Sequence, residues 1–178
     1  MSESDTEPAR RGFLAGALAL IVGAGAVAAP LLSGLAVLLD PLRRRRDDTP
    51  LIQVTNLGVL PADGVPRKFT VRTDRTDAWN TYRDSPVGAV YIRRTPESVV
   101  AHNVVCPHAG CFVGLAPDGN GFRCPCHKSS FDLDGSVNDP ASPAPRGMDS
   151  LDVEVRNGDE VWVRFQNFRP GQAEKTPV

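Results

Sequence analysis

The longest run of uncharged positions lies near the N-terminus, where all 27 residues from Phe13 to Leu39 are uncharged and most are apolar. About 20 such residues are enough for a helix to cross a bilayer. The pattern therefore predicts one transmembrane helix over residues 13–39. A short N-terminal segment precedes it (residues 1–12), and a polar tether follows it (residues 40–50).

Beyond the tether the pattern changes to short stretches of alternating apolar and polar residues, separated by turn residues. Residues 68–71, 89–92 and 98–105 are predicted strands, and the chain contains 16 Pro and 16 Gly. The strongest signal is Asn157-Gly158 between the alternating stretches 151–155 and 161–165, because an Asn-Gly pair between such stretches is typical of a hairpin. No convincing amphipathic helix follows the anchor.

These features predict an antiparallel all-β sandwich over residues 51–166, followed by a C-terminal tail over residues 167–178. We expect this tail to be flexible or docked on a neighbouring subunit. Trp79, Tyr82 and Trp162 are interpreted as packing residues. About 130 residues remain after the anchor, which is enough for one domain with its own core. The net charge of −1 gives no reason to expect binding to nucleic acid.

The candidate chemistry is concentrated in residues 106–129, which contain all four cysteines and two of the three histidines. A C-x-H motif is followed, after fifteen residues, by a C-x-x-H motif. Two thiolates and two imidazoles can hold a structural zinc, and four cysteines can also form disulfides. Zinc would leave Cys111 and Cys126 without a role. The third histidine, His102, lies in a strand pattern and is assigned a structural or surface role.

The two motifs resemble the Rieske pattern, in which two His replace two Cys on one iron of a two-iron cluster. The resemblance implies one [2Fe-2S] cluster. Cys106 and Cys124 would bind the inner iron, and His108 and His127 the outer, solvent-facing iron. It also implies that the cluster-binding part, about residues 103–146, is a small subdomain inserted between strands of the sandwich.

Further positions follow from the same resemblance. It implies a disulfide between Cys111 and Cys126, which needs an oxidising compartment. The Ser129 hydroxyl matches a serine that donates to a bridging sulfide. Phe131 stands where high-potential members carry a tyrosine, so we expect a low reduction potential, better matched to menaquinol than to ubiquinol.

The segment Ser142–Pro145 resembles the proline loop that covers the cluster in quinol-oxidising members, with Pro143 and Pro145 as its prolines. A rigid surface linker is the alternative interpretation.

The N-terminus carries Arg10-Arg11-Gly12-Phe13-Leu14, which resembles a twin-arginine export signal. Ala26-Val27-Ala28 also fits a signal-peptide cleavage site, but the apolar run continues to Leu39 and favours an uncleaved anchor. We therefore predict a single-pass protein of the bacterial inner (plasma) membrane, with its N-terminus in the cytoplasm and its domain on the periplasmic side. Arg43–Arg46 are on the external side in this topology, against the positive-inside rule.

Taken together, these features resemble the Rieske subunit of a cytochrome bc-type quinol–cytochrome c reductase. The resemblance implies an electron carrier that belongs to an oxidoreductase complex, with His108 and His127 facing the quinol and coupled to its protons. The implied partners are a cytochrome b-type subunit, a c-type cytochrome, a membrane quinol and the lipid bilayer. Two alternatives stay open: the exported Rieske small subunit of a molybdenum oxidoreductase such as arsenite oxidase, and a zinc-stabilised binding module.

Overall fold

The computed structural model describes residues 7–43, 49–77 and 79–178. The chain divides between residues 47 and 48 into two compact units, which are described separately.

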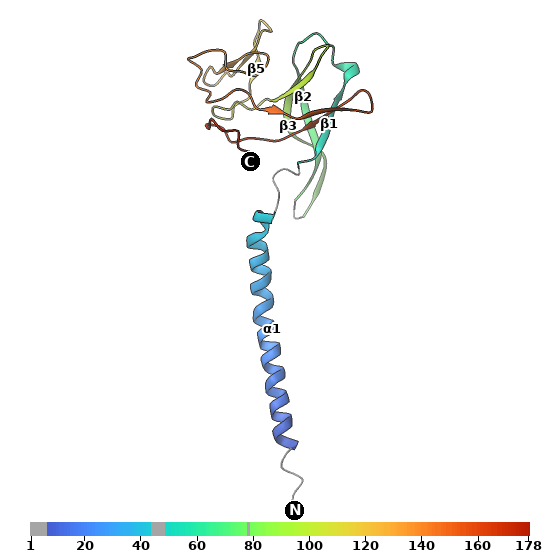
Figure 1. Ribbon diagram of the computed structural model, residues 1–178, viewed down its shortest axis with the longest axis vertical. Helices are drawn as coiled ribbons and strands as arrows, with labels where there is room; N and C mark the ends of the chain where they lie inside the picture. Colours follow the sequence, from blue (N-terminus) through green and yellow to red (C-terminus); the bar gives the residue numbers. More distant parts are fainter. Residues whose placement is uncertain (1–6, 44–48, 78) are drawn as a thin grey trace, which may run out of the picture. The chain divides into compact units, whose positions relative to one another are not determined.

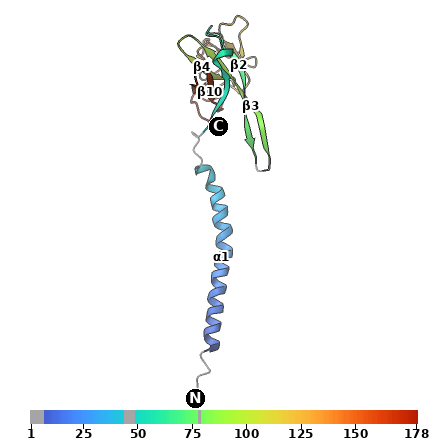
Figure 2. The ribbon, with the colours of Figure 1, turned by 90° about the vertical axis from the view of Figure 1, so that its right-hand side faces the viewer.

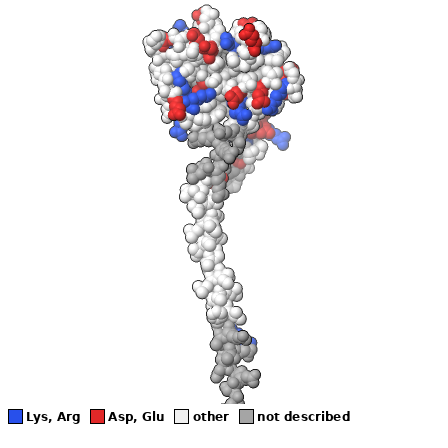
Figure 3. Space-filling model, in the orientation of Figure 1, with Lys and Arg blue, Asp and Glu red and all other residues white. Residues whose placement is uncertain are grey.

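The first unit contains one long helix, α1 (Glu7–Arg43). Its stretch Arg11–Asp40 has a mean hydropathy of 2.1 and is not buried against the rest of the described chain, so by length and composition it can cross a membrane. The helix surface in Figure 3 is uncharged over most of its length. The predicted helix is confirmed, and it extends past both predicted ends. The first four residues of the predicted tether are therefore helical, and residues 44–48 of it lie outside the described residues.

The second unit is built on two antiparallel sheets that share one core (Figure 1). The first sheet has the order β1-β10-β9, with β1 (Leu51–Asn56), β10 (Glu160–Arg164) and β9 (Val153–Arg156). The second has the order β2-β3-β4-β8, with β2 (Arg67–Thr76), β3 (Thr81–Arg94), β4 (Val99–Asn103) and β8 (Ser150–Leu151). A short 3-10 helix, η1 (Leu57–Val59), follows β1. The shared core includes the fully buried Val71, Val90, Ile92, Val161 and Val163.

The hairpin predicted around Asn157-Gly158 is present as β9 and β10. Asn157 and Gly158 have φ values of 50° and 88°, a region that Asn and Gly adopt most readily. The predicted strand 151–155, however, is divided between the two sheets. Leu151 pairs with Ala101 in the second sheet, whereas residues 153–156 pair with β10 in the first.

The segment between β4 and β8 forms a third, smaller sheet, with the order β5-β6-β7. Its strands are β5 (Gly114–Leu115), β6 (Phe122–Arg123) and β7 (Ser130–Phe131). This subdomain has a core of its own, in which Tyr91 of the base packs against Phe122 with ring centroids 4.9 Å apart. The inserted subdomain that the resemblance implies is therefore present, and the turns around its strands hold the two cysteine–histidine motifs.

The C-terminal tail (residues 167–178) packs on the domain of its own chain, so the expectation that it is flexible is wrong, whereas docking on a neighbouring subunit stays a prediction. Phe168 is buried in the main core. The side-chain amide of Asn103, at the end of β4, donates to Gln166 O at 2.9 Å and to Asn167 Oδ1 at 3.0 Å. Burial of the Phe168 ring and these two partly buried hydrogen bonds hold the tail on the domain.

The interpretation of Trp79 and Tyr82 as packing residues is also wrong, because their side chains are 89% and 48% exposed. They belong to the outer end of the β2–β3 hairpin, which projects from the base (Figure 2). On β3, β4 pairs with residues 90–94, and within the described residues no third strand pairs with the outer end of the hairpin. Trp162 is half-buried, and the Arg156 guanidinium lies 5.1 Å from the centroid of its ring.

Candidate metal centre

The first motif lies in a tight turn, Cys106–Cys111, called here the first box. The backbone N–H of Cys106 donates to Cys111 O at 2.7 Å, and that of Gly110 donates to Cys106 O at 2.9 Å. Gly110 has a φ of 80°, which glycine adopts without steric cost. Val105 and Phe112 pair on either side of the turn. The fold therefore fixes the backbone that carries Cys106 and His108.

The second motif lies in a turn of the same design, Cys124–Ser129, called here the second box. The backbone N–H of Cys124 donates to Ser129 O at 2.8 Å, and that of Lys128 donates to Cys124 O at 3.2 Å. Lys128 occupies the left-handed position, with a φ of 64°. The box lies between β6 and β7, so the small sheet sets its position.

A disulfide between Cys111 and Cys126 joins the two boxes, with a Cα–Cα distance of 6.6 Å. This is the pairing that the resemblance implies. Two bonded sulfurs cannot serve as thiolate ligands. Although the sulfurs of Cys111, Cys124 and Cys126 lie within 4.8 Å of one another, only Cys124 of these three offers a free thiol.

The four predicted ligands separate into an inner pair and an outer pair. The thiols of Cys106 and Cys124 are buried, whereas His108 is half-buried and His127 is exposed. The two imidazole rings meet edge to face, with centroids 4.9 Å apart. Burial raises the pKa of the Cys106 thiol, and the neighbouring Cys124 raises it further. The Cys106 thiol would therefore ionise more readily beside a strong positive charge, which a bound metal ion would supply.

Two polar atoms at this centre are buried without a hydrogen-bond partner in the described part of the chain: His108 Nδ1 and Ser129 Oγ. The Ser129 hydroxyl lies near enough to the Cys106 thiol to lower its pKa somewhat, but the contact lacks hydrogen-bond geometry. Unpaired buried polar atoms cost roughly 1–3 kcal/mol each. An unpartnered imidazole nitrogen, an unpartnered hydroxyl and two buried thiols, all carried by the two boxes, fit a metal–sulfur group better than they fit a dry protein core.

The other predicted site positions surround this centre. Phe131 is fully buried in the same core as Cys106 and Cys124. In the segment Ser142–Pro145, called here the proline segment, both prolines are exposed and Ala144 packs against that core.

His102 takes no part in the centre. It is buried in β4 and packs beside Gly135, and burial lowers its pKa. Its predicted structural role agrees with this position.

The sequence interpretation missed Arg146 and Asp149, which form a buried ion pair with their side chains 10% and 4% exposed. Arg146 directly follows the proline segment, and this position was the one sequence feature that could have indicated a role for Arg146 near the site. Nothing in the sequence indicates that the C-terminal tail supplies its other partners.

Two curated relatives align along most of the chain. The menaquinol:cytochrome c reductase iron-sulfur subunit of Bacillus subtilis is 29% identical over 140 residues, covering 77% of this chain and 81% of the relative. The protein of the same name from Geobacillus thermodenitrificans is 29% identical over 161 residues, covering 89% and 92%. Among solved structures, the plasma membrane Rieske protein of Synechocystis PCC 6803 has a TM-score of 0.41 and 21% identity, covering 65% of this chain and 98% of its own.

Residues 59–155, more than half of the chain, match the sequence profile of the Rieske [2Fe-2S] domain. The matched region contains both boxes, the disulfide and the proline segment. This match removes the interpretation as a zinc-stabilised module. The chain belongs to the Rieske [2Fe-2S] domain family, and it carries one [2Fe-2S] cluster.

Proposed function

We propose that this chain is the Rieske subunit of a membrane quinol–cytochrome c reductase, in which it takes one electron from a quinol and passes it to a c-type haem. The observation that carries the proposal is the alignment with two menaquinol:cytochrome c reductase iron-sulfur subunits over 77% and 89% of this chain. The long apolar helix supports it, because by length and composition that helix can hold the chain in the membrane, where a quinol is dissolved.

The proposed ligands are Cys106 and Cys124 on the inner iron, with His108 and His127 on the outer iron. The burial of the two thiols and the exposure of His127 support this arrangement. When bound, the cluster supplies one-electron chemistry at the potential set by two His and two Cys ligands. The chain excludes water from the thiol side and presents the imidazoles to a partner.

The two histidines are also proposed to receive the quinol proton. Imidazole is the side chain that exchanges a proton near neutral pH. The exposed ring of His127 can accept a hydrogen bond from a quinol hydroxyl, and the half-buried ring of His108 lies against it. The proposed quinol is of low potential, as menaquinol is, because Phe131 offers no hydroxyl to a ligand sulfur.

The proposed partners are a cytochrome b-type subunit, which holds the quinol, and a c-type cytochrome, which accepts the electron. We propose that the domain lies on the periplasmic side, and the Cys111–Cys126 disulfide supports this, because such bonds persist in an oxidising compartment. Export by the twin-arginine pathway would carry the domain across with its cluster already inserted. Arg10-Arg11 and the following Phe13-Leu14 are the sequence basis for this step.

The test uses membranes of a strain that lacks the chromosomal copy and expresses the full chain. Adding a reduced menaquinone analogue without oxygen should produce the electron paramagnetic resonance signal of a reduced cluster, and an inhibitor of the quinol site should shift that signal. The His127→Ser variant should show neither effect. A cluster that assembles but is reduced only by arsenite, and not by quinol, would contradict the proposal and favour a molybdenum oxidoreductase.

A further inference from the structure

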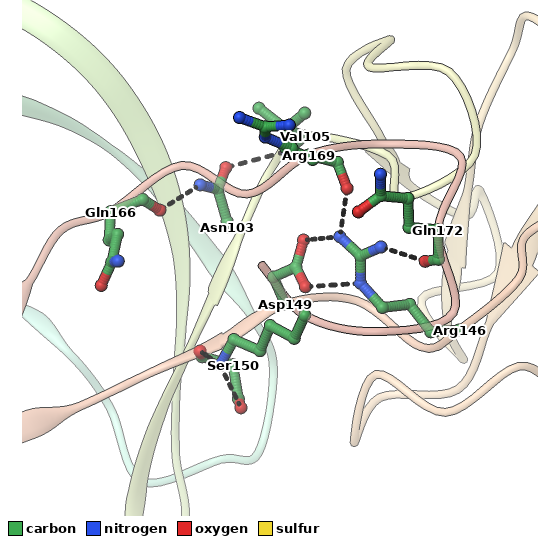
Figure 4. A network of polar contacts seen from close by, with 9 residues as sticks. Asn103, Val105, Arg146, Asp149, Ser150, Gln166, Arg169 and Gln172 are labelled. Atoms are coloured by element: carbon green, nitrogen blue, oxygen red, sulfur yellow. Dashed lines mark hydrogen bonds and ion pairs between the residues drawn. The ribbon is translucent and has the colours of Figure 1, made fainter. Parts of the chain in front are cut away.

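The side chain of Arg146 connects the proline segment to the C-terminal tail. Its Nε and one terminal nitrogen donate to the two carboxylate oxygens of Asp149, both at 2.9 Å. The terminal nitrogens also donate to the backbone carbonyls of Arg169, at 3.1 Å, and of Gln172. Figure 4 shows this guanidinium between the carboxylate and the two carbonyls.

Between these two carbonyls, the tail touches the backbone of the first box. The N–H of Gly171 donates to Pro107 O at 2.8 Å, and Pro107 lies between Cys106 and His108 in the sequence. Gly171 has a φ of 75°, and a Cβ at this position would lie 3.6 Å from His108 O. A Cβ at Gly110, in turn, would lie 3.8 Å from the Pro170 ring.

The remaining contacts tie the tail and Asp149 to the base. The backbone N–H of Asn103 donates to Asp149 O at 2.8 Å. Lys175 donates to Ser150 O at 2.5 Å, and its ammonium lies 4.6 Å from the centroid of the Phe168 ring. Arg169 N–H donates to Thr176 O at 2.9 Å, which closes the tail on itself. The tail is therefore fixed at several points, and Arg146 holds the stretch that contacts the first box.

We propose that Arg146 is a positioning residue for His108, acting through residues 169–172 of the C-terminal tail. The guanidinium sets the distance between the proline segment and the first box, and so fixes the orientation in which the His108 ring is presented. Two hydrogen bonds to the Asp149 carboxylate and two more to backbone carbonyls need the several N–H donors of a planar guanidinium group. Lysine keeps the charge but cannot satisfy all four acceptors.

The proposal deepens the proposed function, since it concerns a residue that the function assigns as a ligand. Its first readout, however, is hydrogen exchange of the first box, which does not depend on quinol oxidation. A failure of the quinol test would leave the exchange result standing. A failure of the exchange test would leave the quinol result standing.

The experiment compares the full chain with Arg146→Lys and Arg146→Met. Arg156→Met is the matched control, because it removes an exposed Arg–Glu pair with side chains 44% and 48% exposed. In both Arg146 variants, the amides of Gly110 and Gly171 should exchange at least about tenfold faster, the scale expected for lost hydrogen bonds to a charged group. The β9–β10 amides should be unchanged, and the resonance of the reduced cluster should broaden.

A second pair of variants disturbs the tail without touching the buried ion pair. Gly171→Ala places a side chain at a φ of 75°, which strains the backbone where Gly171 N–H contacts Pro107 O, whereas Gly158→Ala places the same kind of strain, at a φ of 88°, in the β9–β10 turn. Faster exchange in the first box and a broadened resonance are expected only for Gly171→Ala. The proposal is overturned if the first box is unaffected, if Arg146→Lys behaves as the wild type, or if exchange rises equally across the whole domain.

Discussion

The rings of His108 and His127 stand edge to face, with centroids 4.9 Å and planes 89° apart, although each ring belongs to a different turn. The disulfide joins these turns at Cys111 and Cys126, one residue from His127 and three from His108. The position of one imidazole relative to the other thus depends on the backbone of two boxes and on the covalent bond between them.

Replacement of either proposed histidine ligand should abolish the cluster. His108→Ser and His127→Ser each remove one imidazole, and the remaining donors cannot hold the outer iron. His102→Gln is the control, because His102 is buried in β4 beside Gly135. Iron and acid-labile sulfide should be two atoms each per chain in the control and near zero in the ligand variants. Retention of both irons in His127→Ser would refute this ligand assignment.

Cys111→Ser should make the cluster labile without removing a ligand. The disulfide spans 15 residues of sequence, and closing such a loop stabilises the folded state by about 3 kcal/mol in the chain-entropy model. Thermal unfolding and the rate of cluster loss measure the effect. In native, unreduced wild-type protein, neither Cys111 nor Cys126 should react with an alkylating agent, and reaction of both would disprove the bond in solution.

Phe131→Tyr should raise the reduction potential. A phenol donor aimed at a ligand sulfur stabilises the reduced, more negative state, and a hydrogen bond to a charged group contributes roughly 1.5–3 kcal/mol. A change of about 1.4 kcal/mol corresponds to 59 mV for one electron, so we expect a rise of several tens of millivolts. Protein-film voltammetry at one pH measures it.

Phe122→Tyr is the matched control for that variant, because Phe122 is buried in the same core and pairs directly with Phe131. It adds a hydroxyl to the core at a position outside the motif. A potential that falls or stays unchanged in Phe131→Tyr, or rises equally in both variants, would remove the argument for a low-potential quinol based on Phe131.

Lys128→Gly should stabilise the domain by about 1 kcal/mol, because a side chain in the left-handed region carries a steric cost that glycine does not. Lys128 has a φ of 64°. Lys128→Ala is the control, since it removes the same charge and keeps the Cβ. Chemical denaturation should rank the glycine variant above the alanine variant. Equal stability of the two would show that the backbone at this position is relaxed.

The domain should lose stability in acid through His102. Burial holds the folded-state pKa of this imidazole below its ordinary value. Its contribution to stability is therefore fully present above the unfolded pKa, roughly 6.5, and is lost as the pH falls below that value. Thermal unfolding between about pH 7.5 and pH 5.5 measures the loss. His102→Gln should flatten the profile, and an unchanged slope would assign the effect to other groups.

The local pattern of residues was enough to predict the helix and the hairpin, because neighbouring residues determine both. A run of 27 uncharged, mostly apolar residues favours a helix, because a helix satisfies its backbone hydrogen bonds within the segment, and Asn157-Gly158 adopts the positive φ values that close a hairpin. The four candidate ligands were also readable, because metal binding requires particular atoms at short spacings.

Other features depend on which surfaces meet, and no local pattern encodes that. Trp79 reads as a core residue, yet it is exposed because the hairpin that carries it extends past its last partner strand. The tail was expected to be flexible or docked on a neighbouring subunit, yet Phe168 is buried in the main core of its own chain and Gly171 N–H donates to Pro107 O. The buried pair of Arg146 and Asp149 is stable only because carbonyls more than 20 residues away complete its hydrogen bonds. Donor atoms and backbone propensity belong to the sequence, whereas burial and long-range partners are properties of the folded chain alone.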